Sequence, residues 1–273
     1  MKNGWIRQVF PGSFVLLAIV GLAGCGGGGD GGGGVPTSPT IITKVASLDN
    51  TQETTGSTSA GKGGGILAVD TATGKASGFV ASTGVPGIAS HIHSGARGVA
   101  GGIIVPLVGG PDIWVVPDNT TLSATNVTAF QNGNLYFNIH SAAFPGGEIR
   151  GQIDTTPTSI KFAALDNTQE TTGSNSTAKG GGVLAVDTAT GKAAGFSVSA
   201  GVPGIASHIH SGARGVAGGI IVPLAGGPSH WFVPDNTALS GTNVTDFQNG
   251  NLYYNIHSAA FPGGEIRGQI DFP

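Results

Sequence analysis

The stretch Ser90–Leu107 reads SHIHSGARGVAGGIIVPL, and the same letters return unchanged at Ser207–Leu224. It contains two histidines separated by a single residue, then a glycine-rich segment, then an apolar run. This is the pattern of a strand, a loop and a second strand. Because the whole stretch recurs, the chain contains two copies of one folding unit.

A second stretch fixes the size of that unit. NIHSAAFPGGEIRGQID runs over Asn138–Asp154 and returns at Asn255–Asp271, and both repeated stretches are displaced by 117 positions. A period of this length is too long for a solenoid repeat and suits a small globular domain. We therefore predict two tandem domains, at residues 41–156 and 157–273.

The N-terminal residues are typical of an export signal followed by a tether. A basic start and a short apolar run predict a signal peptide over residues 1–24, because a membrane-spanning helix needs roughly 20 apolar residues. The sequence LAGC ending at Cys25 resembles the bacterial lipobox, which implies cleavage before Cys25 and lipid attachment to it. Residues 25–40, rich in glycine and proline, are predicted to be a flexible tether.

This N-terminal pattern predicts an exported protein that is anchored by its lipid in the membrane of the cell envelope. Gly26 after Cys25 resembles the pattern of lipoproteins released to the outer membrane, which is the expected location in a Gram-negative cell.

Composition excludes several functions. Cys25 is the only cysteine, so a lipidated chain has no free thiol for catalysis, for cysteine-ligated zinc or for an iron–sulfur cluster. The net charge is only −3 and 10% of residues are charged, so no basic face suggests nucleic acid as a partner.

Short alternating segments separated by glycine and proline predict an all-β fold. In the first copy the expected strands are Ile66–Asp70, Lys75–Ser82, Ser90–Ser94, Ile103–Leu107, Trp114–Val116, Leu135–Ser141 and Glu148–Asp154. One short helix is expected between Ser123, as its N-terminal cap, and Gly133, at its C-terminal end. This strand spacing is typical of a β-sandwich or Greek-key barrel.

The alternation of side chains between the two faces of each strand predicts a functional site. Residues two apart in a strand share a face, so His91 and His93 point to one side of their strand. His140 lies on the polar side of a later strand whose other face, Leu135, Phe137 and Ile139, is apolar. If these two strands are neighbours, each domain gathers three imidazoles beside a carboxylate and a guanidinium.

Neutral imidazoles are good ligands for copper or zinc, whereas calcium prefers oxygen. We predict His91, His93 and His140 as metal ligands. Glu148 is predicted as a fourth ligand or as the group that orients a ligating histidine. Arg150 is predicted to neutralise Glu148 or to hold an anion beside the metal. By the repeat, the second site comprises His208, His210, His257, Glu265 and Arg267.

Two other interpretations stay open. The same side chains can form a stabilising network of hydrogen bonds and ion pairs between the final hairpin and its neighbour. Each domain is then a structural or interaction module, and two linked copies serve avidity for a polymer or surface partner. A polar organic or anionic ligand in place of a metal is the remaining interpretation.

The pieces SHIHSGARGVAGG and LYFNIHSAAFPGGEIRGQI together resemble the CHRD domain, a family found in chordin and in many microbial secreted proteins. The resemblance covers Ile41–Asp154 and Ser159–Phe272. It implies an immunoglobulin-like β-barrel with a distant similarity to copper–zinc superoxide dismutases, and it assigns no defined biochemical role.

In that comparison, His91 and His93 resemble the His-x-His copper ligands of the dismutases and His140 resembles a later copper ligand. Each repeat lacks the further bridging histidine and a zinc cluster. Dismutase activity is therefore not expected, although a mononuclear copper site is compatible with the residues. The expected function is binding rather than catalysis, with a metal ion and an extracellular protein or polysaccharide as candidate partners.

Overall fold

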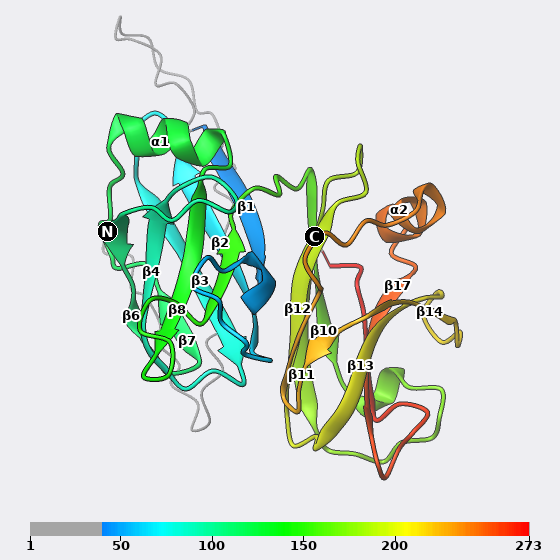
Figure 1. Cartoon of the computed structure of the whole chain (residues 1–273). Coiled ribbons are helices and arrows are strands. Elements are labelled where there is room, and N and C mark those ends of the chain that lie inside the picture. The colour runs from blue at the N-terminus through cyan, green and yellow to red at the C-terminus, as the bar shows by residue number, and fades with distance from the viewer. Residues whose placement is uncertain (1–39, 273) are drawn as a thin grey trace, which may run out of the picture. The chain divides into compact units, whose positions relative to one another are not determined.

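The computed structural model describes residues 40–272 (Figure 1). The expected signal peptide, Cys25 and nearly all of the expected tether lie outside the described residues. Within residues 40–272, no helix is both long and apolar enough to cross a membrane.

The first repeat consists of short strands with one α-helix and one 3-10 turn. Its elements are β1 (Ile41–Leu48), η1 (Asn50–Gln52), β2 (Lys62–Asp70), β3 (Ala76–Thr83), β4 (Gly87–Ser94), β5 (Ile103–Pro106), β6 (Val108–Gly109), β7 (Ile113–Val115), α1 (Ala124–Gln131), β8 (Leu135–Ser141) and β9 (Ile149–Gln152). The all-β fold predicted from the sequence is confirmed.

The second repeat contains the same series of elements. They are β10 (Ser159–Leu165), η2 (Asn167–Gln169), β11 (Lys179–Val186), β12 (Ala193–Ala200), β13 (Gly204–Ser211), β14 (Gly219–Pro223), β15 (Ala225–Gly226), β16 (His230–Phe232), α2 (Gly241–Gln248), β17 (Leu252–Ser258) and β18 (Ile266–Gln269).

Each repeat has two antiparallel sheets. In the first repeat their strand orders are β1-β2-β3-β7-β6 and β5-β4-β8-β9, and the second repeat has the equivalent orders β10-β11-β12-β16-β15 and β14-β13-β17-β18. The chain changes sheet after β3, β5 and β7, which is the crossing pattern of a sandwich rather than of a meander. Figure 1 shows α1 across one end of the strands of the first repeat.

The core of the first repeat lies between its two sheets. Leu67 and Val80 from one sheet share a buried cluster with Ile92, Phe137 and Ile139 from the other. The predicted apolar face of β8 is therefore confirmed, and its opposite face is free for polar residues.

The predicted helix is also confirmed. The Ser123 hydroxyl oxygen accepts a hydrogen bond from the backbone N–H of Asn126 at 3.2 Å, and Gly133 follows the helix with a φ of 72°. Such a serine cap and a left-handed glycine are the ordinary boundaries of a helix.

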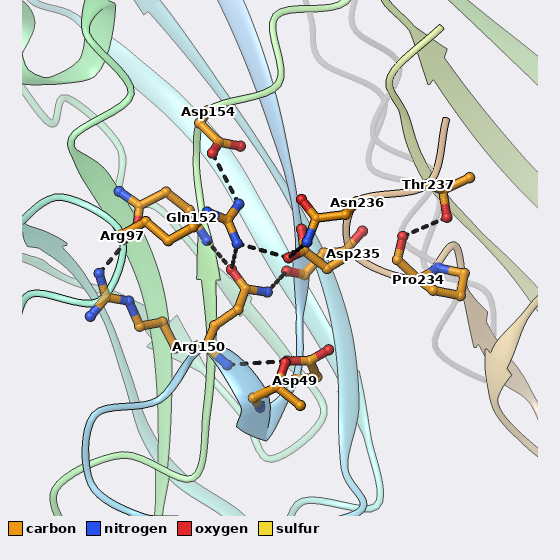
Figure 2. A network of polar contacts seen from close by, with 12 residues as sticks. Asp49, Arg97, Arg150, Gln152, Asp154, Pro234, Asp235, Asn236 and Thr237 are labelled. Atoms are coloured by element: carbon orange, nitrogen blue, oxygen red, sulfur yellow. Dashed lines mark hydrogen bonds and ion pairs between the residues drawn. The ribbon is translucent and has the colours of Figure 1, made fainter. Parts of the chain in front are cut away.

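The strand β1 was not among the strands predicted from the sequence. Its register places Lys44 opposite Leu67, and Lys44 is only 5% exposed. The Lys44 ammonium donates to the carbonyl of Gln131 at 2.9 Å, which satisfies the buried charge. After β1, Asp49 and Arg150 exchange both backbone hydrogen bonds, so the chain entering η1 lies beside β9 (Figure 2).

Candidate metal centre

The two strands that carry the histidines are neighbours. β4 pairs with β8, with Ala89 opposite His140, His91 opposite Asn138 and His93 opposite Tyr136. Residues that face each other across an antiparallel pair share one side of the sheet. All three imidazoles therefore lie on the face of this sheet that points away from the core, as the strand parity predicted.

The imidazoles are close enough to share one ligand. Nδ1 of His91 lies 3.0 Å from Nε2 of His140, and the ring centroids of His93 and His140 are 5.9 Å apart. One nitrogen from each of the three rings can be chosen so that all three lie within 4.8 Å of one another. His93 and His140 are buried, whereas His91 is half-buried.

Backbone carbonyls decide where the ring protons are. Nδ1 of His93 lies 2.9 Å from the Gly101 oxygen, and Nδ1 of His140 lies 3.0 Å from the Pro145 oxygen. Because a carbonyl oxygen can only accept, both Nδ1 atoms carry the proton and donate. Both Nε2 atoms are then lone-pair acceptors, and the bond between His91 and His140 is donated by Nδ1 of His91.

One of these lone pairs is unused. Nε2 of His93 is buried and has no hydrogen-bond partner among the described residues. A buried polar atom without a partner is costly and marks a site where a partner is missing. This acceptor, together with Nε2 of His140, fits a metal ion: the second nitrogen of a metal-binding histidine commonly donates to a backbone carbonyl.

The electrostatics keep the rings neutral. Burial lowers the pKa of His91 to about 4, with added repulsion from the neighbouring His140 and His93. Burial also lowers the pKa of His93 and the pKa of His140, although their carbonyl partners oppose the shift. All three imidazoles are therefore uncharged near pH 7, which is the state that binds metals.

The glycine-rich loop 95–102 closes over this face of the sheet. The Arg150 guanidinium donates to the carbonyls of Val99 and Ala96 at 3.0 and 2.7 Å. Gly101 donates its N–H to the Tyr136 hydroxyl at 3.0 Å, and its carbonyl accepts from His93. A side chain at Gly101 would collide with the backbone carbonyl of Ser94 at the end of β4, so glycine is needed there.

Arg150 reaches the site through an aromatic ring rather than directly. Its guanidinium carbon lies 3.5 Å from the centroid of Tyr136, and that ring stacks on His93 with centroids 4.9 Å apart. Arg150 is 1% exposed and also donates to Gln152, which is drawn beside it in Figure 2. A buried guanidinium that contacts an aromatic face is a favourable cation–π arrangement.

Glu148 and Arg150 are not ion-paired within residues 40–272. The Glu148 carboxylate accepts from the Ser59 hydroxyl at 2.6 Å, and the group of mutually close ligand atoms contains the three histidines without it. Burial lowers the pKa of Arg150, Tyr136 and Glu53 oppose that shift, and burial raises the pKa of Glu53 itself. The hydrogen-bond acceptors of Arg150 are instead the carbonyls of Val99 and Ala96 and the side chain of Gln152.

The sequence interpretation also missed the η1 segment. The side-chain oxygen of Gln52 accepts a hydrogen bond from the backbone N–H of Gln152 at 3.0 Å, and Glu53 is the next residue in the chain. A signal for these residues was present, since TQETTG at Thr51–Gly56 recurs at Thr168–Gly173.

Comparison with known proteins agrees with this architecture. The family model of the CHRD domain matches residues 44–153 and 162–270. The chain belongs to the CHRD domain family. No curated protein and no solved structure matches the chain.

The second CHRD domain repeats the geometry of the first. Nδ1 of His208 lies 3.0 Å from Nε2 of His257, and Nδ1 of His210 donates to the Gly218 carbonyl at 2.9 Å. Nε2 of His210 is again buried without a partner among the described residues. Nδ1 of His257 donates to the Pro262 carbonyl at 3.0 Å, so both Nε2 atoms are acceptors and only that of His210 is unused.

The groups around the second site also correspond. The Arg267 guanidinium lies 3.5 Å from the Tyr253 ring, and the Glu265 carboxylate accepts from the Ser176 hydroxyl at 2.7 Å. Burial raises the pKa of Glu170, the counterpart of Glu53, to about 7. Each CHRD domain therefore carries one complete copy of the candidate site.

Proposed function

We propose that each CHRD domain binds one copper or zinc ion through its three histidines. The observation that carries this proposal is the buried, unpartnered Nε2 of His93, which lies among two further imidazoles whose ring nitrogens are within 4.8 Å. Nitrogen donors of this kind suit copper and zinc, and a bound ion would use the lone pair that the protein leaves free.

The chain's own residues prepare the site for such an ion. The Gly101 and Pro145 carbonyls hold the rings of His93 and His140 with Nε2 turned away from those carbonyls. His91 is the adaptable ligand, because its proton can move from Nδ1 to Nε2 and release the nitrogen that faces His140. Since the three rings are neutral near pH 7, binding there requires no loss of a ring proton.

The test is metal uptake by the full chain with Cys25→Ser, so that no thiol competes. After removal of metal and exposure to copper or zinc in turn, elemental analysis should find about two ions per chain, one for each triad. The double variant H93Q/H210Q should retain few or none. His230→Ala removes a histidine outside both triads and is the matched control. Equal uptake by all three proteins would contradict the proposal.

A structural and interaction role is the second candidate, favoured by the burial of Arg150 in a network of backbone carbonyls. In that case His140→Ala lowers the melting temperature, and neither copper nor zinc changes the melting temperature of the unaltered chain. A metal ion that binds only the folded state must instead raise it. The effect of metal on the melting curve therefore separates the two roles.

We further propose that the protein acts at the cell envelope, exported and held by a lipid on Cys25, in the outer membrane of a Gram-negative cell. The lipobox-like LAGC supports this. Two linked domains suit binding to an extracellular protein or polysaccharide, by avidity. We propose binding rather than catalysis, since each repeat offers one three-histidine group and a dismutase uses a second, zinc-holding cluster.

A further inference from the structure

The ligand set of each triad leaves a coordination position without a protein donor. Structural zinc sites are closed by four protein ligands, whereas three ligands leave a position for water or an external ligand. Among residues 40–272, the groups of mutually close metal-binding atoms contain three histidines each and no carboxylate. A fourth donor must therefore come from outside this group.

One side of the triad is accessible from solvent. His93 and His140 are 7% and 8% exposed, whereas His91 is half-buried and is the most exposed of the three. β5, which pairs with β4 at the edge of this sheet, places the exposed Pro106 opposite His91. His91 therefore marks the side from which we expect a small ligand to approach the triad.

The charge around the triad favours an anion. Three neutral imidazoles leave both charges of a divalent ion uncompensated, and the buried Arg150 adds positive charge behind Tyr136. Glu53 offsets part of the charge of Arg150, and burial raises the pKa of Glu53. The Glu148 carboxylate accepts a hydrogen bond from the Ser59 hydroxyl and is not among the mutually close ligand atoms.

We propose that each loaded triad takes a small anion from solvent at its open coordination position. This inference rests on the proposed metal site and names the class of ligand that the site recognises. It also gives the two domains a way to bind an anionic group presented by another molecule.

The probe is azide, added to the Cys25→Ser chain loaded with Cu²⁺ in chloride-free buffer. Azide should produce a new azide-to-copper charge-transfer absorption that saturates at about one azide per copper ion. Perchlorate at the same concentration is the control for ionic strength and should produce no such band.

A designed carboxylate gives a sharper test. Ala89 is half-buried and lies opposite His140 on the face that carries the triad, so Ala89→Asp places a competing anion beside the metal. The variant should still take up two copper ions, while the azide band falls to about half because the second domain is unchanged. Ala206→Asp, at the equivalent place opposite His257, should produce the same loss.

The outcomes separate this inference from the proposed function. Copper uptake with no azide band overturns the anion inference and leaves the metal site standing. An azide band that Ala89→Asp and Ala206→Asp leave at full height also overturns it, because the anion then binds elsewhere. Failure to take up copper overturns both.

Discussion

At the scale of single residues, the buried histidines should make the metal-free protein sensitive to acid. The pKa of His91 is about 4 in the folded chain and near 6.5 when it is exposed, so between these values the unfolded state binds more protons. The stability that a neutral His91 contributes is complete above pH 6.5 and is lost as the pH falls toward 4. We expect the melting temperature to fall over this range, measured with a chelator present.

The variant H91N/H208N isolates this contribution. Buried carboxyls act in the opposite direction, because the raised pKa of Glu170, about 7, makes the folded state bind a proton more readily than the unfolded chain does. The prediction is therefore a difference: the variant should lose less stability than the unaltered chain between pH 7 and pH 4.5. Parallel losses in the two proteins would show that these histidines are not neutralised by folding.

At the scale of elements, we expect the buried arginine to stabilise the loop over the site more than the loop's own side chains do. In the second domain, Arg267 donates to the carbonyls of Val216 and Ala213, both at 2.8 Å. Arg267→Gln should cost that domain about 2–4 kcal/mol, because it removes charge-assisted hydrogen bonds made by a guanidinium that is only 1% exposed. Scanning calorimetry would show the loss as a lower transition temperature.

Arg214→Gln is the matched control in the same domain. Arg214 pairs with Asp271 at 2.7 Å, but the two side chains are 58% and 40% exposed. An exposed ion pair contributes about 0–1 kcal/mol, so this variant should melt close to the unaltered chain. Equal destabilisation by the two arginine variants would contradict the assignment of Arg267 as the anchor of the loop.

These elements also show how much of the site follows from the sequence. Alternation identified both faces of β8, and the pairing of β4 with β8 then brought together histidines 49 positions apart. The partner of Arg150 could not be predicted, because its acceptors are the backbone carbonyls of Ala96 and Val99 and carry no side-chain signature. Nor does local alternation reveal that a charged residue such as Lys44 lies in a buried strand.

At the scale of the whole molecule, duplication makes each domain the control for the other. The first triad uses only β4 and β8, and the second uses only β13 and β17, so the two ligand sets share no residue. Changes at sites with no shared partners are usually additive. The variant H91Q/H93Q/H140Q should therefore hold about one ion per chain.

The metal affinity of the remaining site shows whether the two domains bind metal independently. If the triads are independent, the second triad should bind its ion with the dissociation constant that it has in the unaltered chain, as measured by isothermal titration. The mirror variant H208Q/H210Q/H257Q should give the same result for the first triad. A large drop in affinity at the surviving site would mean that the domains form a coupled pair. Unchanged affinity means that duplication supplies a second equivalent site, so any gain in binding comes from linking the two on one chain.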